Sequence, residues 1–143
     1  MRPAKGECLM YESLTAYIPV LEKGFFGEWL GGHDDILPFV VYSWDIQTMT
    51  EKIFCFADDH REEGFGDYSR ILYDHGIVWS KGSMREADVS ALDGKTVFAL
   101  LLGAVRAEKF CDGALMYFCE NGCVLRWLEW LREVDEEPKS MHL

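Results

Sequence analysis

Positive charge is scarce in this sequence. Its 143 residues include 14 lysines and arginines against 25 aspartates and glutamates, which gives a net charge of −11 at neutral pH. A protein that binds a nucleic-acid backbone needs clustered basic side chains, so we expect no direct nucleic-acid binding. The ordinary role of such a charge is solubility. The alternative is an acidic decoy, whose carboxylates at 58–67 and 129–137 would line one face and occupy a nucleic-acid-binding protein.

The sequence also lacks an apolar run long enough to cross a bilayer. Its central run, residues 97–105, has nine residues, where about 20 are needed. The amino-terminal segment has no apolar run that fits a secretory signal. We therefore expect no contact with a membrane and a cytoplasmic protein with reduced thiols. The five cysteines are odd in number and show no C-x-x-C spacing, so we interpret them as small core residues and predict no metal site.

Recognisable catalytic motifs are missing as well. The sequence has no G-x-S-x-G segment and no glycine-rich phosphate loop. The four histidines lie in turns, at helix ends or in the tail, and they are His33, His60, His75 and His142. We predict no catalytic residue and no cofactor. Whether the protein is an enzyme stays open, and a protein without catalytic activity is favoured.

Helical periodicity, in contrast, is strong. Because the run 97–105 is apolar on every face of a helix, it belongs inside a core. Residues 91–110 are thus predicted to form the most buried helix, which starts at Ser90 with Ser90 and Asp93 as a capping box. Further amphipathic stretches on both sides of this run predict a mainly α fold. We expect one compact domain over residues 1–143, a bundle of about five or six helices, with 1–10 and 135–143 as loose ends.

Residues 25–42 interrupt the helical pattern. They contain three glycines, a proline and two aromatic or β-branched runs, 25–30 and 39–42. This composition predicts an irregular segment or a short β-hairpin across Gly31-Gly32 to Pro38. An exposed apolar patch in this segment, or around Trp130, would indicate a surface for protein interaction.

The candidate site is the charged cluster that follows the central apolar run. Glu108 and Asp112 lie one helical turn apart and could hold a divalent cation or share a proton. Arg106 could bind a carboxylate or phosphate through two parallel hydrogen bonds. We take Arg106, Glu108 and Asp112 as candidate ligand-binding residues. The structural alternative is that Arg106 and Lys109 stabilise a helix carboxyl end while Asp112-Gly113 forms a turn.

Tryptophans beside predicted turns are candidates for the walls of a ligand pocket. They are Trp29, Trp44 and Trp79. Pockets for small molecules are lined mainly by apolar and aromatic side chains. Packing in the core is the commoner role of such residues.

Four segments carry a resemblance to a known family. They are FGEW at 26–29, PFVVYS at 38–43, ADVSALD at 87–93 and GAVRAEKFCDGAL at 103–115. Over about residues 11–134 the chain resembles a family of uncharacterised bacterial proteins, a domain of unknown function. The resemblance implies a bacterial, intracellular, stand-alone domain, and it implies no particular activity, cofactor or catalytic residue.

The sequence therefore predicts a small acidic module that binds a protein partner or forms a homodimer. The first alternative is a small-ligand-binding protein or enzyme that uses the cluster of Arg106, Glu108 and Asp112. The second alternative is the acidic decoy of a nucleic-acid-binding protein.

Overall fold

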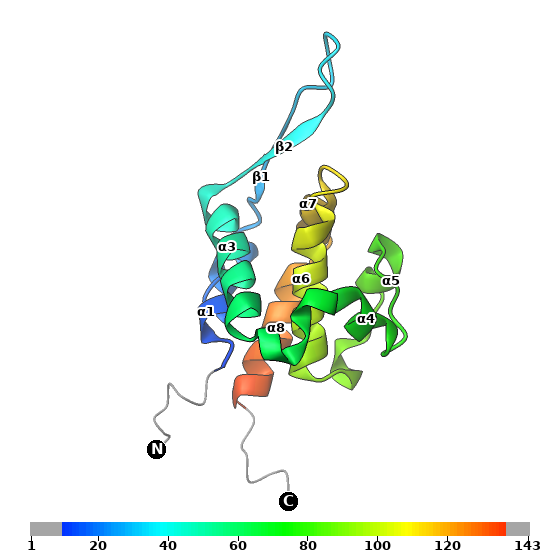
Figure 1. Ribbon diagram of the computed structural model, residues 1–143. Helices are drawn as coiled ribbons and strands as arrows, with labels where there is room; N and C mark the ends of the chain where they lie inside the picture. Colours follow the sequence, from blue (N-terminus) through cyan, green and yellow to red (C-terminus); the bar gives the residue numbers. More distant parts are fainter. Residues whose placement is uncertain (1–9, 137–143) are drawn as a thin grey trace, which may run out of the picture.

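The computed structural model describes residues 10–136 and confirms the mainly α fold (Figure 1). The α-helices are α1 Glu12–Thr15, α2 Ile18–Lys23, α3 Trp44–Asp59, α4 Tyr68–Tyr73, α5 Lys81–Arg85, α6 Gly94–Ala107, α7 Ala114–Glu120 and α8 Cys123–Glu136. Short 3-10 helices are η2 Arg61–Glu63, η3 Phe65–Asp67 and η4 Val89–Ala91. The two strands are β1 Gly27–Leu30 and β2 Phe39–Tyr42.

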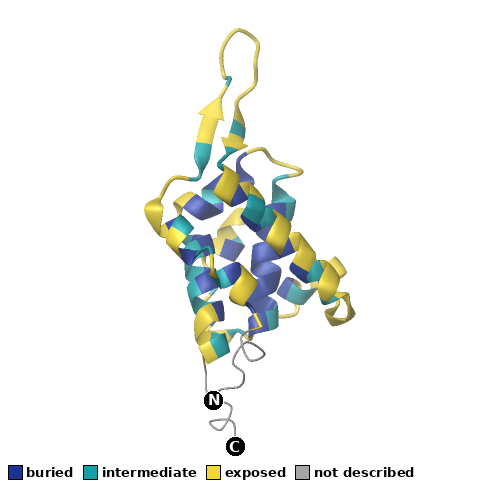
Figure 2. Cartoon of the chain, turned by 90° about the vertical axis from the view of Figure 1, so that its left-hand side faces the viewer, coloured by how far each residue is buried: buried dark blue, intermediate teal, exposed yellow. Residues whose placement is uncertain are grey.

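Helix α6 lies at the centre of the helical body, as its apolar sequence predicts. Eleven of its 14 residues are buried, and α3, α4, α7 and α8 pack around it. Figure 2 shows the buried residues inside the helical body and mainly exposed ones on the hairpin. The Phe98 ring contacts Phe56 of α3 and Phe65 of η3, with centroid distances of 4.6 and 4.7 Å. A helix that is apolar all round is stable only in such surroundings, because each face has to be removed from water.

The start of α6 differs from the prediction. Its N-cap is Asp93, whose side chain accepts a hydrogen bond of 2.9 Å from the Thr96 backbone N–H. Ser90 lies instead in η4, where Asp88 accepts bonds from its backbone N–H and its hydroxyl. Leu92 has an extended backbone, which separates the two helices. The predicted start at Ser90 is therefore wrong, and Asp93 alone caps the helix.

Helix α8 packs its apolar stripe against α6 and also contacts α1. The backbone N–H of Tyr11 donates a hydrogen bond of 2.8 Å to Asp135 Oδ2, which joins the beginning of α1 to the end of α8. Of the predicted loose ends, residues 1–9 and 137–143 lie outside the described residues. Asp135 and Glu136 belong to α8.

Strands β1 and β2 form the predicted hairpin. They are antiparallel, with Gly27 opposite Tyr42 and Leu30 opposite Phe39. The chain reverses at Asp34 and Asp35, whose φ angles of 51° and 66° give the type I′ turn that suits the twist of a hairpin. The hairpin projects from the helical body at the end opposite to the beginning of α1 and the end of α8 (Figure 1).

Candidate functional site

Glu108 follows α6 directly, and its carboxylate connects three segments of the chain. It accepts hydrogen bonds of 2.6 Å from the Tyr42 hydroxyl, 3.0 Å from the Gly113 N–H and 3.0 Å from the Leu115 N–H. The Tyr42 hydroxyl in turn accepts a bond of 3.0 Å from the Met116 N–H. The carboxylate thus satisfies free amides at the start of α7 and holds the base of the hairpin.

Tyr42 is protonated throughout the physiological range. Burial raises the pKa of its phenol well above the usual value, and the hydrogen bond to Glu108 and the negative charge of that carboxylate raise it further. The phenol therefore remains a hydrogen-bond donor to Glu108.

The structure separates Arg106 from the other two predicted ligand residues. Arg106 lines a hollow between α3 and α6, and neither Glu108 nor Asp112 is among the residues that line it. Asp112 is exposed in the turn before α7. No three His, Cys, Asp or Glu side chains within residues 10–136 gather in a way that could hold a metal ion.

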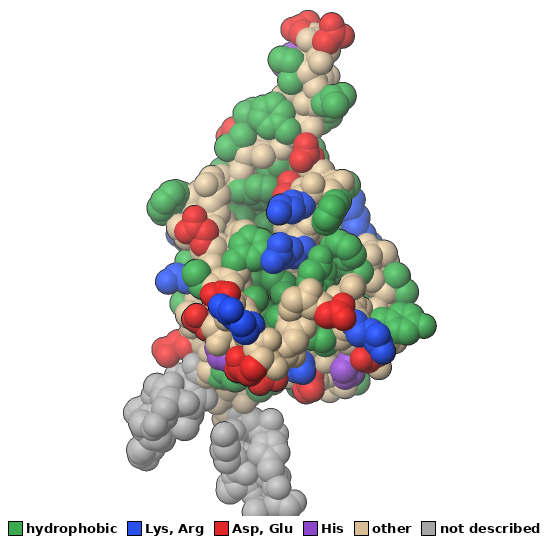
Figure 3. Space-filling model, in the orientation of Figure 1, with side chains coloured by type: hydrophobic (Ala, Val, Ile, Leu, Met, Phe, Trp, Pro, Cys, Tyr) green, Lys and Arg blue, Asp and Glu red, His purple; other side chains and the backbone are tan. Residues whose placement is uncertain are grey.

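Arg106 opens onto a hollow of about 480 Å³ between the end of α3, η3 and the end of α6. We call it the basic hollow, and it is lined by Phe54, Ala57, Asp58, Arg61, Phe65, Gly66, Leu102, Arg106 and Lys109. The Arg106 guanidinium lies over the Phe54 ring, 5.0 Å from its centroid. Lys and Arg side chains gather among hydrophobic ones at the centre of the face in Figure 3. The hollow therefore combines positive charge with apolar walls.

The charges in the basic hollow are only partly balanced. Arg61 forms a salt bridge of 2.8 Å with Asp58, the one carboxylate in the lining. Across the described part of the chain, Arg106 and Lys109 take part in no salt bridge. The hollow thus keeps two uncompensated positive charges in a protein whose net charge is −11.

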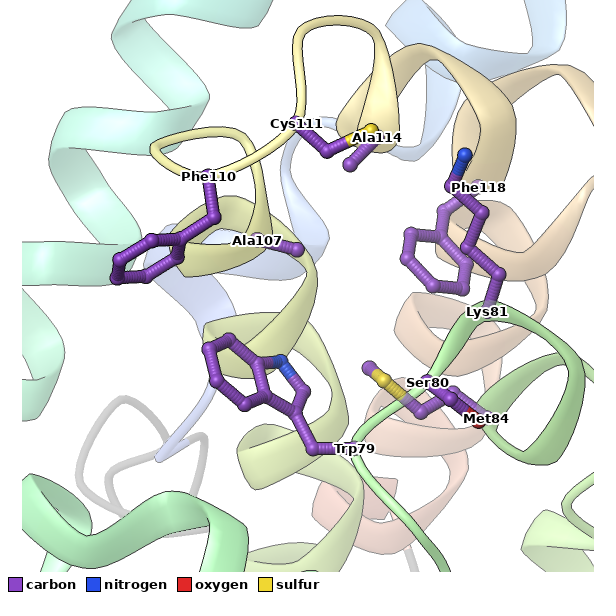
Figure 4. A pocket seen from close by; sticks show the side chains of 9 residues that line it. All are labelled: Trp79, Ser80, Lys81, Met84, Ala107, Phe110, Cys111, Ala114 and Phe118. Carbon is purple, nitrogen blue, oxygen red and sulfur yellow. The ribbon is translucent and has the colours of Figure 1, made fainter.

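A second, more apolar pocket of about 250 Å³ lies on the other side of the 106–113 segment (Figure 4). It is lined by Trp79, Ser80, Lys81, Met84, Ala107, Phe110, Cys111, Ala114 and Phe118. Trp79 is fixed by a hydrogen bond of 3.0 Å from its Nε1 to the Gly103 carbonyl, and its ring meets Phe110 edge to face. Of the three tryptophans expected at a pocket, Trp79 lines this one and Trp29 and Trp44 do not.

The hairpin carries the most extensive exposed apolar surface near this segment. Eight large apolar side chains on it or beside it are between 38% and 81% exposed, and we call them the hairpin surface: Phe25, Trp29, Leu30, Ile36, Leu37, Phe39, Val41 and Trp44. Alternation along the strands puts Trp29 and Tyr42 on the face toward the helical body. Leu30, Phe39 and Val41 lie on the opposite, outer face, where Glu28 is the only polar residue.

Trp29 forms a contact between the hairpin and the helical body. A Cβ atom added to Gly113 would overlap the six-membered ring of Trp29, so the two residues are in close contact. Gly113 has a φ of 91°, a conformation that glycine adopts without strain. The 106–113 segment thus supports the hairpin at two points, Glu108 and Gly113.

Comparison with known proteins gives one family. Residues 36–137, well over half of the chain, match the family of unknown function DUF6508. The chain belongs to this family. Three of the four segments that carry the resemblance lie within the match, and FGEW precedes it. No curated protein and no solved structure matches the chain.

The DUF6508 match begins in the loop of the hairpin and continues to the end of α8. It therefore contains the basic hollow, the apolar pocket and the Glu108 contacts with α7, while β1 lies ahead of it. Within residues 10–136, no helix of this DUF6508 member is long and apolar enough to span a bilayer.

The cysteines of the DUF6508 protein divide into two groups. Cys119 and Cys123 are buried, as expected for core residues, and burial raises the pKa of the Cys119 thiol to about 12. Cys55 and Cys111 are exposed, so the core interpretation is wrong for them. Cys8 lies outside the described residues.

Sequence reasoning missed most of the basic hollow. Arg106 and Lys109 are three residues apart and share one side of α6 and the turn that follows it. This spacing could have linked Lys109, rather than Asp112, to Arg106. The contribution of Phe54 and Arg61 depends on how α3 packs against α6, which no local pattern specifies.

Proposed function

We propose that this DUF6508 protein is a binding module that associates with a second copy of itself through the hairpin surface. One observation carries the proposal. The outer face of a hairpin that projects from the body presents Leu30, Phe39 and Val41 to solvent. An antiparallel sheet with one face in water normally alternates apolar and polar residues and turns its polar side chains outward.

The hairpin surface exposes a large apolar area. Its eight side chains expose on the order of 800 Å² in total, spread over the two faces, the tip and the base of the hairpin. Exposed apolar surface of this extent is unusual on a monomer and indicates an interaction site. A two-stranded sheet is also only marginally stable by itself in water, so a partner would stabilise it.

A second copy fits both the outer face and the charges of the hairpin. The outer faces of two copies can pack against each other around a two-fold axis, which removes Leu30, Phe39 and Val41 of both hairpins from water. With the axis perpendicular to the strands, the two hairpins run antiparallel, which brings the acidic turn of one copy beside the base of the other. Asp34 and Asp35 would then approach Lys109, which is exposed on the 106–113 segment.

Two matched variants test this contact. Val41→Glu places a charge on the outer face of the hairpin, where Val41 is 47% exposed. Val78→Glu makes the same change at a residue that is 57% exposed and lies outside the hairpin. In sedimentation velocity at micromolar concentration we expect a dimer for the wild type and for Val78→Glu. The Val41→Glu dimer should dissociate at least about tenfold more readily, which corresponds to about 1.4 kcal/mol.

Two results would contradict self-association. One is a wild-type protein that stays monomeric over the whole concentration range. The other is a Val41→Glu dimer as stable as the Val78→Glu dimer. Affinity purification from the native host would then test whether the hairpin surface binds a different protein.

The acidic decoy has less support than self-association. In the 58–67 segment, Asp58 pairs with Arg61 and Glu63 lies 3.8 Å from Lys95. Carboxylates that are partly neutralised by cations imitate a phosphate backbone less well than free ones. One observation supports the small-ligand alternative: Arg106 lines the basic hollow.

A further inference from the structure

We infer that the basic hollow is a binding site for a small organic anion that carries a carboxylate or phosphate beside an apolar ring. The inference does not rest on the proposed self-association, because the hollow lies on the helical body and shares no residue with the hairpin surface. Lys109 alone also enters the charge contact proposed between the two copies.

Arg106 is positioned but has no polar partner for one of its donors. Its guanidinium lies over the Phe54 ring, and its Nε is buried with no hydrogen-bond acceptor in the described chain. The Nε is out of reach of solvent, so the donors that can meet an anion are the terminal nitrogens of the guanidinium, which takes part in no salt bridge within residues 10–136. Two such donors bind a carboxylate or phosphate through a planar pair of hydrogen bonds.

Lys109 adds a second positive charge to the same hollow. It lines the hollow with Arg106, and neither side chain is neutralised by a carboxylate within residues 10–136. Asp58, the acidic residue of the lining, is already paired with Arg61. On a protein with a net charge of −11, a hollow with two free cations is a local positive site that attracts an anion.

The remaining walls favour a ring next to the anionic group. Phe54, Leu102 and Ala57 contribute apolar atoms to the lining. The volume of about 480 Å³ falls within the range of small-molecule pockets, roughly 300 to 1,000 Å³. An aromatic or other apolar ring can contact Phe54 and Leu102 while its anionic substituent reaches Arg106 and Lys109.

Three probes, titrated into the full chain, distinguish the contribution of the anionic group to binding from that of the ring. Phenyl phosphate has both groups, inorganic phosphate has the charge alone, and benzyl alcohol has the ring without the charge. The readout is the ¹H–¹⁵N resonance of the Arg106 Nε–H, assigned by its loss in Arg106→Lys. We expect saturable shifts with phenyl phosphate, at least about tenfold weaker binding of inorganic phosphate, and no shift with benzyl alcohol.

Substitutions identify the hollow as the site. Arg106→Met should weaken phenyl phosphate binding at least about tenfold, and Lys109→Met should weaken it several-fold, as expected for a lost charge-assisted contact. For these variants, amide resonances of residues around the hollow report the binding. Arg106→Lys keeps the charge but loses the planar pair of donors, so it should also bind more weakly than the wild type. The matched control is Arg70→Met, which removes an exposed arginine of α4 outside the hollow and should change nothing.

The inference fails if phenyl phosphate causes no saturable shift of the Arg106 Nε–H. It also fails if Arg70→Met weakens binding as much as Arg106→Met, since net charge alone would then explain the effect. If Arg106→Met does not fold, Lys109→Met and Arg106→Lys decide the question. Sedimentation of Arg106→Met and Arg106→Lys is expected to stay unchanged, which separates this site from the hairpin contact.

Discussion

Tyr42 and Glu108 are 66 residues apart in the sequence and share a hydrogen bond of 2.6 Å between the phenol and the carboxylate. Tyr42 ends the second strand of the hairpin, and Glu108 follows the central helix. The projecting hairpin and the helical core are therefore joined by a charge-assisted contact, which is stronger than a bond between two neutral groups.

Removing the Tyr42 hydroxyl should destabilise the fold. Tyr42→Phe takes a donor from Glu108 and leaves the Met116 N–H without its acceptor. We expect a loss of about 1 to 3 kcal/mol in the free energy of unfolding, measured by urea denaturation. Tyr73→Phe is the control, because Tyr73 is 70% exposed. Equal stabilities of the two variants would show that the Tyr42 contact contributes nothing.

Gly113→Ala should disturb the contact between the hairpin and the helical body. The new methyl group would overlap the Trp29 ring, and alanine is also strained at a φ of 91°. Gly64→Ala is the matched control, since Gly64 has a similar φ of 84° but open space around it. We expect Gly64→Ala to cost about 1 kcal/mol and Gly113→Ala at least about 1 kcal/mol more.

A double-variant cycle assigns the excess loss to Trp29. When Trp29 is replaced by Ala, the overlap disappears, and Gly113→Ala should then cost no more than Gly64→Ala. An excess that persists without Trp29 would point to a different neighbour of Gly113.

Tyr11 makes the protein sensitive to alkaline pH. Burial raises the pKa of its phenol from 10.0 to about 12, and the nearby charges of Asp135, Asp93 and Glu63 add to the shift. The folded state therefore holds this proton more tightly than the unfolded state does. The resulting stability is fully present below pH 10.0 and is lost as the pH rises toward about 12.

Tyr11→Phe should remove part of this pH dependence. The variant has no phenolic proton at position 11, so its free energy of unfolding should fall less steeply between pH 10.0 and about 12 than that of the wild type. Urea denaturation at several values in this range measures both slopes. Parallel curves for the two proteins would mean that Tyr11 does not contribute.

The sequence predicts the helical core well because the core depends on local periodicity. The uninterrupted apolar run 97–105 forces α6 inside, and the stripe that includes Trp127, Leu128 and Leu131 places α8 against it. The start of α6 is harder to predict, since Ser90 and Asp93 both have the chemistry of an N-cap. The choice depends on the extended backbone at Leu92, which local side-chain patterns do not reveal.

The candidate site is predicted less completely, because its geometry depends on contacts between distant segments. The sequence locates the charged cluster at the end of a buried helix. It does not show that Tyr42 and the amides of α7 occupy the Glu108 carboxylate, or that Phe54 lies under Arg106. These contacts form only after α3, the hairpin and α7 have packed around α6.

The hydrogen bond between Tyr11 and Asp135 keeps the beginning of α1 beside the end of α8. Both of these helix ends lie at the end of the helical body away from the hairpin (Figure 1). A chain anchored near either of them, on a biosensor chip or within a larger polypeptide, directs Leu37 and the rest of the loop between the strands toward the surrounding solution. The attachment point and the loop between the strands thus lie at opposite ends of the folded body.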